Sequence, residues 1–276
     1  MLTDKRIGII GVGAMGGALC RGLIQAEAAP ASKIVIFDPH SVHTESLQNT
    51  LGIKVAESNI QLARYTDIII LCVKPYNIVP VLDEICETLQ RDEKKPSPLL
   101  ISIAAGVRLA TLEEHTGANI PVIRAMPNTP AQLGKGACAF CAGSHTTSKQ
   151  MEQAKAIFDS VGISVQVPES SMDAVTALSG SGPAYVYLMI EAMIDGGVKA
   201  GLPRDVAHQL ATQTVLGAAQ MVKETGLHPA QLRDMVTTPA GTTIAALASL
   251  EQSGVRAALI EAVERAAIRS RELGQN

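Results

Sequence analysis

The chain divides into two parts by the spacing of its hydrophobic residues. Up to residue 167, short apolar runs alternate with segments of helical periodicity; the runs are 6–11, 33–38, 67–73, 99–106, 120–126, 137–143 and 163–167, and the helical segments are 14–28, 41–50, 77–90 and 147–161. Apolar runs of this length without polar alternation are typical of strands that are covered on both faces. Their alternation with helices predicts an α/β domain with a mostly parallel sheet over residues 1–167.

Strand patterns stop after Pro168, and longer helical patterns replace them. Helices are expected at 184–200, 204–225, 229–235, 243–253 and 255–273. Helix-ending residues separate them, namely "GLP" at 201–203, "GLHP" at 226–229, and Gly254. Residues 168–276 are therefore predicted to form an all-helical domain.

Two of the predicted helices, 184–200 and 204–225, are apolar around most of their circumference. A surface helix normally carries one apolar stripe, and a domain of this size is too small to cover both helices by itself. We expect them to pack against the same helices of a second subunit, in a homodimer or a dimer-based higher oligomer. Burial against the α/β domain is the alternative.

Composition narrows the classes of function. Hydrophobic residues make up 47% and charged residues 18% of the 276 positions, the formal net charge is -3, and tryptophan is absent. A nucleic-acid surface needs a basic patch, and single strands need aromatic stacking platforms, so we expect no nucleic-acid partner. No apolar run approaches the length that spans a bilayer, so we expect no membrane association.

Cysteine usage and the first residues indicate a cytoplasmic protein. An apolar strand begins at residue 6, which leaves no room for a secretory signal. The five cysteines are an odd number without the spacings of a disulfide framework, as in reducing compartments. Cys138 and Cys141 form one C-x-x-C pair, but "GACAFCAG" around them is typical of a strand of small residues rather than of a redox or zinc site.

A glycine-rich loop indicates a dinucleotide site. "GVGAMG", residues 11–16, follows the first strand and opens the first helix, and Asp38 lies 22 residues beyond Gly16 at the end of the second strand. In this context Gly11 permits the tight turn, Gly13 lets the backbone approach the pyrophosphate, and Gly16 permits close packing of helix against strand. The helix N-terminus then holds the phosphates.

Asp38 leaves the choice of nicotinamide cofactor open. A carboxylate at this position accepts a hydrogen bond from a ribose 2′-hydroxyl and repels the 2′-phosphate of NADP, which favours NAD. His40 and His43 could offset that repulsion if either ring approaches the phosphate. The residues alone therefore do not decide between NAD(H) and NADP(H).

Three further loops follow predicted strands and belong to the ligand crevice of a doubly wound sheet. They are "CVKP" at 72–75, "IAAG" at 103–106 and "AMPNTP" at 125–130, and each could also be a plain turn. The residues expected to face the ligand are Lys74 and Pro75 beside the ribose, Ala104 and Ala105 where a flat ring needs space, and Asn128, which offers a side-chain amide.

Two segments of the helical half are unusual, "LSGSGPAYVYLMIEAM" at 178–193 and "LRDMVTTPAGTTIAAL" at 232–247. Together with "GVGAMG", "VKP", "SIAAGV" and "RAMPNTP", they resemble the 1-pyrroline-5-carboxylate reductase family, whose members make proline. The resemblance runs from about residue 6 to residue 272, and six short motifs in this order make it specific.

The resemblance implies an N-terminal Rossmann domain, a C-terminal helical dimerisation domain, and the NAD(P)H-dependent reduction of the cyclic imine 1-pyrroline-5-carboxylate to L-proline, the last step of proline biosynthesis. It favours NADP(H), while Asp38 keeps NAD(H) open because related NADPH enzymes often carry serine there. Cofactor contacts are implied for Gly11, Val12, Gly13, Ala14, Met15 and Gly16, for Asp38, Asn59, Val73, Lys74 and Pro75, and near the nicotinamide for Ala104 and Ala105. Substrate contacts match Gly241, Thr242 and Thr243. A second departure is "PAG" at 239–241 in place of the common "PGG", which requires Ala240 to adopt a conformation open to a β-carbon.

The expected chemistry depends on positioning more than on acid-base catalysis. A cyclic imine can arrive already protonated and accept hydride at carbon, so it needs no proton donor of the histidine or lysine kind. The six histidines lie outside the two unusual segments, in no triad or metal pattern. Backbone amides of Gly241, Thr242 and Thr243 at a helix start are expected to seat the substrate carboxylate, and the Thr243 hydroxyl to hydrogen-bond the imine nitrogen as the catalytic side chain.

Ser179 and Ser181 are expected to bind substrate as well. We interpret "SGSGPA" at 179–184 as a tight turn that caps the long helix and faces the cofactor. An N-cap with proline near the first helical position is the purely structural alternative.

Two rival functions fit the sequence less well. A β-hydroxy-acid or 6-phosphogluconate type dehydrogenase would carry a catalytic lysine on the helix after its own glycine-rich turn, and here that helix has none before Lys199. A dinucleotide-binding regulator without catalysis would keep "GVGAMG" but would have no reason to keep a polar anion seat in an apolar helical dimer.

Overall fold

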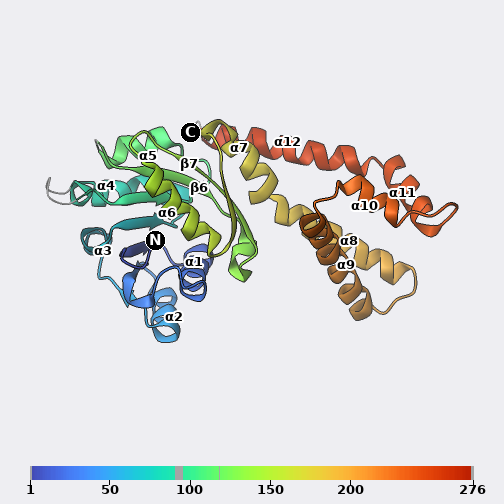
Figure 1. Cartoon of the computed structure of the whole chain (residues 1–276), viewed down its shortest axis with the longest axis horizontal. Coiled ribbons are helices and arrows are strands. Elements are labelled where there is room, and N and C mark those ends of the chain that lie inside the picture. Colours follow the sequence, from blue (N-terminus) through green and yellow to red (C-terminus); the bar gives the residue numbers. More distant parts are fainter. Residues whose placement is uncertain (1, 91–95, 118, 275–276) are drawn as a thin grey trace. The chain divides into compact units, whose positions relative to one another are not determined.

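A computed structural model describes residues 2–90, 96–117 and 119–274 of the chain. Its contacts divide it into two compact units, an α/β unit of Met1–Ser181 with Arg265–Asn276, and a helical unit of Gly182–Glu264 (Figure 1). The predicted domain boundary between residues 167 and 168 stays a prediction. The contacts instead divide the chain after Ser181 and assign the end of the last helix to the α/β unit.

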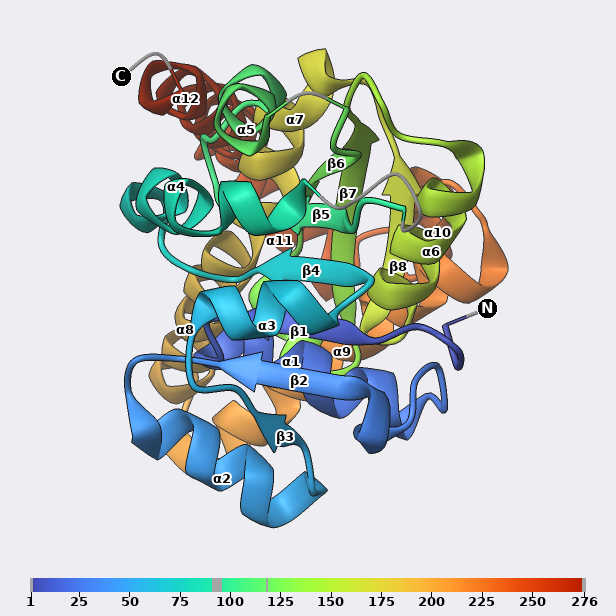
Figure 2. The ribbon, with the colours of Figure 1, turned by 90° about the vertical axis from the view of Figure 1, so that its left-hand side faces the viewer.

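The described part of the α/β unit holds an eight-stranded sheet in the order β3-β2-β1-β4-β5-β6-β7-β8. All neighbouring strands are parallel except β6 and β7, which are antiparallel. Figure 2 shows this order from β3 through β5. The strands are β1 (Ile7–Ile10), β2 (Ile34–Phe37), β3 (Lys54–Val55), β4 (Ile68–Leu71), β5 (Leu99–Ser102), β6 (Val122–Met126), β7 (Gly136–Ala142) and β8 (Gly162–Gln166). The predicted mostly parallel sheet is confirmed.

Helices cover both faces of the sheet, as the unalternating apolar runs predicted. Ile68 and Ile70 of β4 point into one core, whereas Ile69 and Leu71 point into the other. The first core is closed by α1 (Ala14–Gln25), α2 (Ser41–Leu51) and α6 (Ser148–Asp159). The second is closed by α3 (Asn59–Tyr65), α4 (Ile78–Leu89) and α5 (Leu109–Thr116).

Three short elements beside the central strands were not predicted. β3 has two exposed residues, and α3 and α5 have seven and eight residues. Each is too short to repeat a hydrophobic period, so the sheet and its neighbours define these elements more than their own sequence does.

The helical unit contains α8 (Gly182–Lys199), α9 (Arg204–Thr225), α10 (Pro229–Met235), α11 (Thr242–Gln252) and the first part of α12 (Val255–Leu273). These helices match the predicted ranges closely. The last residues of α12 belong to the α/β unit, where the Ser270 hydroxyl donates a hydrogen bond to the Asp173 carboxylate at 2.6 Å. In the described part of the helical unit, the buried hydrophobic side chains are Ile194, Ala207 and Ala211.

Residues before α8 correct the interpretation of "SGSGPA" as a tight turn. A short helix, α7 (Met172–Val175), runs through the π-helical turn η5 (Thr176–Gly180) into α8, and Ser181 between them is also helical. Pro183 has no backbone N–H to donate to the Ser179 carbonyl, which lies four residues earlier in the helical pattern. Asn128 donates its side-chain N–H to that carbonyl at 2.9 Å, so the helix continues with one wide turn instead of breaking.

Candidate functional site

The glycine-rich loop lies at the centre of the sheet, where β1 ends. Gly11 has φ +87°, and a β-carbon there would lie 3.0 Å from the Cys72 backbone. A β-carbon on Gly16 would lie 2.1 Å from the Gly11 carbonyl oxygen, so α1 approaches the turn too closely for any side chain. Around Gly13, in contrast, nothing lies within 4 Å of the β-carbon position. The loop is therefore tight on its protein side and open above Gly13.

The start of α1 can receive an anion. Its N-cap is Gly13, which provides no side-chain hydrogen bond to the first turn. N–H groups of a first turn have no partner within the helix and favour negative charge. Ala14 is exposed and Met15 half-buried at this end, while Val12 is buried below it. The six predicted loop residues thus form one backbone cradle.

The strand order places this cradle at the point where ligands bind in doubly wound sheets. Chain order reverses between β1, which continues to β2, and β4, its other neighbour. The crevice at such a switch point lies outside the carboxyl ends of the two strands. Val73, Lys74 and Pro75 follow β4 directly, so they lie opposite the loop that follows β1. Val73 is half-buried, and Lys74 and Pro75 are exposed.

Asp38 is turned toward the loop. Its Oδ2 accepts the Val12 N–H at 2.9 Å, and its Oδ1 accepts the His40 N–H at 2.9 Å. Burial alone would raise the pKa of this carboxyl, but hydrogen bonds from His40 and Val12, with the nearby His43 ring, outweigh it and hold the pKa below its ordinary value. Asp38 is therefore a carboxylate at neutral pH and fixes the glycine-rich loop to the end of β2.

Two histidines converge on the same carboxylate; the sequence suggested that His40 and His43 could approach the phosphate, but not that both contact Asp38. His40 Nδ1 lies 3.2 Å from Oδ1 of Asp38, and His43 Nδ1 lies 3.6 Å from Oδ2. Their ring centroids are 5.9 Å apart. The spacing of these three side chains, within 4.8 Å, would also admit a small divalent cation, but hydrogen bonds and charge account for it without one. The signal was available, because positions 40 and 43 are one turn apart at the start of a helix.

Asn59 offers a buried acceptor near the end of β3. Its amide nitrogen donates to Glu84 of α4 at 2.7 Å, which fixes the orientation of the amide. Among the described residues, the other end of the same amide, Oδ1, is a buried side-chain atom without a hydrogen-bond partner. A buried acceptor without a donor is costly, so a ligand hydroxyl or amino group would be stabilised there. The dinucleotide expected from the sequence fits this observation and the open cradle above Gly13.

Ala104 and Ala105 lie on the loop that follows β5. Ala104 is buried and Ala105 is exposed, and neither side chain extends beyond its β-carbon. The helix after this loop is held at its start, because the Leu109 N–H donates to Glu169 at 2.7 Å. The same carboxylate pairs with the buried Arg124 guanidinium at 3.0 Å. The helix after the loop is thus anchored at its start, and the two alanines add little bulk to the loop itself.

Asn128 and Ser179 are brought together, but through structural hydrogen bonds. Besides its bond to the Ser179 carbonyl, Asn128 accepts the Ala137 N–H at 2.8 Å through its side-chain oxygen. The Ser179 hydroxyl donates to the Val175 carbonyl at 3.0 Å, inside its own helix. Asn128 therefore holds the π-helical turn against the end of β6, and Ser181 is half-buried just beyond it. Ligand contacts for these three residues stay predictions.

The predicted substrate segment lies in the helical unit, at the start of α11. Its N-cap is Gly241, with no side-chain hydrogen bond to the first turn that Thr242 and Thr243 begin. A β-carbon on Gly241 would lie 2.3 Å from the Thr238 hydroxyl, so any larger residue there would require the Thr238 side chain to move. Thr242 is exposed and Thr243 half-buried. The result is a second uncapped helix start, with a threonine hydroxyl beside it.

Ala240 adopts the left-handed conformation, with φ +56°. The turn therefore keeps the shape that a second glycine would give, and the β-carbon bears the steric cost. The sequence left open whether Ala240 tolerates this conformation or shifts the loop. In the structure Ala240 keeps the positive φ, so the loop is not shifted.

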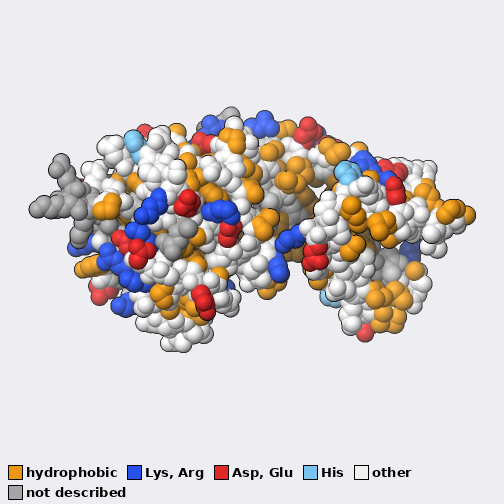
Figure 3. Space-filling view, in the orientation of Figure 1, with side chains coloured by type: hydrophobic (Ala, Val, Ile, Leu, Met, Phe, Trp, Pro, Cys, Tyr) orange, Lys and Arg blue, Asp and Glu red, His pale blue; other side chains and the backbone are white. Residues whose placement is uncertain are grey.

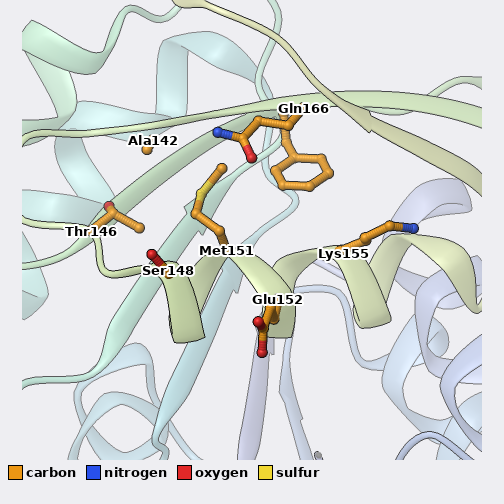
Figure 4. Close-up of a pocket in the computed structure, with 8 residues that line it drawn as sticks. Ala142, Thr146, Ser148, Met151, Glu152, Lys155 and Gln166 are labelled. Atoms are coloured by element: carbon orange, nitrogen blue, oxygen red, sulfur yellow. The ribbon is translucent and has the colours of Figure 1, made fainter.

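A pocket of about 530 Å³ lies elsewhere, between α6 and strands β7 and β8 (Figure 4). Ala142 on its rim pairs with Ile123 near the start of β6, so the pocket opens at the edge of the sheet opposite the glycine-rich loop. It contains none of the predicted site residues. Cys138 and Cys141 on β7 face opposite cores, and burial raises the pKa of the Cys141 thiol to about 11. The C-x-x-C pair is structural, as expected.

Comparison with known families divides the chain in a similar way. Residues 169–273 match the family model described as "Pyrroline-5-carboxylate reductase dimerisation". Residues 6–106 match the model described as "NADP oxidoreductase coenzyme F420-dependent". Within the described residues, no helix has the length and hydropathy needed to cross a bilayer.

Three similar proteins cover essentially the whole chain. A pyrroline-5-carboxylate reductase of Methanosarcina acetivorans is 46% identical over 99% of this chain and 100% of its own length. The crystal structure of Plasmodium falciparum pyrroline carboxylate reductase with NADP bound matches with TM-score 0.87 and 36% identity, covering 99% of each chain. The Coxiella burnetii pyrroline-5-carboxylate reductase structure matches with TM-score 0.92 and 34% identity, again covering 99% of each chain.

Proposed function

This chain belongs to the pyrroline-5-carboxylate reductase family, and from that premise we propose that it reduces 1-pyrroline-5-carboxylate to L-proline with NADPH as the preferred hydride donor. The observation that carries the proposal is that each unit holds an uncapped helix start, one at Gly13 on a glycine-rich loop and one at Gly241 beside a threonine hydroxyl. The first suits a pyrophosphate and the second a carboxylate.

Several residues of the α/β unit support the cofactor part of the proposal. The backbone from Gly11 to Gly16 would hold the pyrophosphate. The Asn59 Oδ1 atom would accept a hydrogen bond from the adenosine, and Val73 to Pro75 would line the ribose. Ala104 and Ala105 would leave space for the nicotinamide. NADP in the Plasmodium falciparum relative, together with the NADP oxidoreductase match, favours NADP(H) over NAD(H).

The helical unit would hold the substrate. Backbone N–H groups of Gly241, Thr242 and Thr243 would bind its carboxylate, and the Thr243 hydroxyl would hydrogen-bond the ring nitrogen. When bound, NADPH would supply the hydride for the imine carbon; the electron pair of the C=N double bond would move to nitrogen, which would keep the proton it already carries. No general acid is needed for this step, so the chain contributes mainly orientation, worth roughly 7 kcal/mol in favourable cases.

The assembly belongs to the same proposal. The helical unit exposes large hydrophobic side chains on α8, α9, α11 and α12, visible over its surface in Figure 3. They include Leu188 of α8, Leu216 of α9 and Leu250 of α11, and the dimerisation-model match covers all these helices. We infer a homodimer in which these faces pack against their copies. The five free cysteines fit the reducing cytoplasm.

The activity is tested with the purified full chain, NADPH or NADH, and 1-pyrroline-5-carboxylate. Loss of reduced-nicotinamide absorbance should be accompanied by an equal amount of L-proline, measured by amino-acid analysis. The same assay with a 2-hydroxy or 3-hydroxy acid and the oxidised cofactor tests the dehydrogenase alternative. No turnover of the imine with either cofactor would overturn the proposed function.

A further inference from the structure

The carboxyl end of β2 carries a cluster of three ionisable side chains that the proposed reaction does not use. Asp38 is held by two backbone N–H groups, and its two oxygens face the Nδ1 atoms of His40 and His43 at 3.2 and 3.6 Å. The carboxylate is nearly buried, whereas 78% of the His40 side chain and 48% of the His43 side chain are exposed. Both rings are therefore accessible to a ligand that binds at the surface beside Asp38.

The position of this cluster determines which part of a dinucleotide it would meet. A carboxylate at the end of the second strand, after a glycine-rich loop, is placed for the 2′-position of the adenosine ribose. That position carries a hydroxyl in NAD(H) and a phosphate in NADP(H). The cluster therefore lies where the two cofactors differ.

Protonation reverses the charge of the cluster. With both imidazoles neutral, Asp38 leaves one net negative charge, which attracts a 2′-hydroxyl and repels a phosphate. With both imidazoles protonated, the cluster carries one net positive charge and up to two new N–H donors for phosphate oxygens. Histidine is the residue type whose charge ordinarily changes closest to neutral pH, so it is the side chain suited to such a reversal.

We propose that His40 and His43 form, with Asp38, a proton-dependent seat for the 2′-phosphate of NADP(H), so that preference for NADPH over NADH increases as the pH falls. This inference rests on the proposed function for the identity of the cofactor. It explains how a chain with a carboxylate at this position still accepts a phosphorylated cofactor.

Charged residues on the neighbouring elements do not replace the pair. α2 itself carries Glu45, and the elements packed against α2 and β2 carry Arg21 on α1, Lys54 on β3 and Arg64 on α3. Glu57 precedes α3, and the exposed Lys74 follows β4. Within the described ranges, none of these six has a recorded ion pair with Asp38, His40 or His43. The local charge at the end of β2 therefore follows the protonation of the two rings.

The test measures the preference for NADPH as a ratio at two pH values. Dissociation constants of the protein for adenosine 2′,5′-bisphosphate and adenosine 5′-phosphate are measured by calorimetry at about pH 6.5 and 8.5, with a chelator present. In parallel, kcat/KM is measured for NADPH and NADH. We expect both ratios to favour the 2′-phosphate about tenfold more at the lower pH.

Two variants separate the rings from other titrating groups. The 2′-phosphate itself titrates near about pH 6, which affects every variant equally. The double variant His40→Asn, His43→Asn should therefore lose most of the pH dependence of the ratio. Only the contribution of the 2′-phosphate itself should remain. His145→Asn, on an exposed loop distant in sequence, is the matched control and should keep the wild-type dependence.

The outcomes are distinct. A ratio that changes equally with pH in wild type and in the double variant overturns the inference, as does a flat ratio in wild type. Binding of the bisphosphate with the expected pH dependence, without turnover of the imine, would overturn the proposed reaction and leave this site standing. Failure to bind either nucleotide overturns both.

Discussion

Both faces of the sheet in the α/β unit carry a buried core, whereas the helical unit, over its described residues, buries the hydrophobic side chains of only Ile194, Ala207 and Ala211. The difference does not come from a lack of large hydrophobic residues, since α8 alone exposes Tyr187, Leu188, Met189 and Met193. It comes from geometry, because a sheet is covered by helices of its own chain. The helices of the helical unit bury only a small cluster of hydrophobic side chains among themselves.

The comparison shows how the proposed site is divided. In the α/β unit, the proposed cofactor site is held by the unit itself: the glycine contacts, the Asp38 bond to Val12 and the Asn59–Glu84 bond are all internal. In the helical unit, the proposed substrate seat lies on a helix whose apolar faces are exposed. We therefore expect cofactor binding to survive loss of the partner subunit, and catalysis to be lost with it.

The largest expected effect comes from a charge on the exposed face of α8. Leu188, of which 67% is exposed, becomes buried in the inferred dimer, so Leu188→Asp would place a carboxylate from each subunit in an apolar interface. Such burial costs several kcal/mol, and self-association should weaken at least about a hundredfold. Analytical ultracentrifugation should show the mass of one chain, with proline formation abolished and NADPH binding retained.

Tyr65→Asp is the matched control for that substitution. Tyr65 is a large side chain in the α/β unit with 56% exposure, so a charge there should leave the assembly and the activity intact. A Leu188→Asp variant that remains dimeric would contradict the inferred interface. Loss of NADPH binding together with the dimer would contradict the expectation that the α/β unit binds the cofactor without the partner subunit.

The second effect concerns the proposed substrate seat. Thr243→Ala removes one hydroxyl from the start of α11, and a hydrogen bond to a charged ligand is worth about 1.5–3 kcal/mol. We expect kcat/KM for 1-pyrroline-5-carboxylate to fall about ten- to a hundredfold, with the NADPH dissociation constant near that of wild type. Steady-state kinetics and fluorescence titration measure the two quantities separately.

Thr214→Ala controls for the loss of a threonine in the same unit. The Thr214 hydroxyl donates to the Leu210 carbonyl within α9, at 2.7 Å, and lies outside the proposed site. Its kinetics should match wild type. An equal loss of NADPH affinity in Thr243→Ala would contradict the assignment of this residue to the substrate.

A third effect is expected on the cofactor side alone. Asp38→Ser removes the carboxylate from the position of the 2′-phosphate, while the serine hydroxyl can still accept the Val12 N–H. The ratio of kcat/KM for NADPH to that for NADH should rise about five- to tenfold, because a unit charge near a phosphate contributes about 1 kcal/mol in water. KM for 1-pyrroline-5-carboxylate should stay near its wild-type value.

Asp67→Asn is the corresponding control. Asp67 likewise accepts a backbone N–H, from Arg6 at 2.9 Å, and its pKa is also lowered by Arg6 against the opposing effect of burial. Asp67 precedes β4, so it lies at the amino ends of the parallel strands, whereas Asp38 lies at their carboxyl ends. If both variants changed the cofactor ratio alike, the effect would come from net charge and not from the site.

The sequence predicted those elements whose hydrophobic pattern is long enough to repeat. The side chains of Ile68–Leu71 point alternately into the two cores, and four consecutive apolar residues predict a strand that is covered on both faces. The antiparallel pairing of β7 with β6 left no such trace, because a strand has the same pattern in either direction. The π-helical turn was also not predictable, since it depends on a bond between Asn128 and a carbonyl 51 residues away.

Parts of the candidate site could be predicted where all the residues concerned lie in one short segment of the sequence. "GVGAMG" and "PAGTT" each place a glycine at a helix start, and the structure has both helix starts uncapped by side chains. Contacts between segments were missed. The orientation of Asn59 by Glu84 joins positions 25 residues apart, and nothing in either local sequence announces it.

The smallest expected effect concerns the strain at Ala240. Its φ of +56° disfavours a residue with a β-carbon by about 1–2 kcal/mol, and glycine removes that cost while adding some freedom to the unfolded chain. Ala240→Gly should therefore stabilise the protein by about 0.5–1 kcal/mol, a Tm increase of about 1–4 °C. Ala245→Gly, in the interior of α11, should have the opposite sign and cost about 1 kcal/mol. Scanning calorimetry at one fixed protein concentration compares the two, because the stability of a dimer depends on concentration. A lower Tm for Ala240→Gly would mean that the Ala240 methyl group makes contacts, in the assembled helical unit, that outweigh its backbone strain.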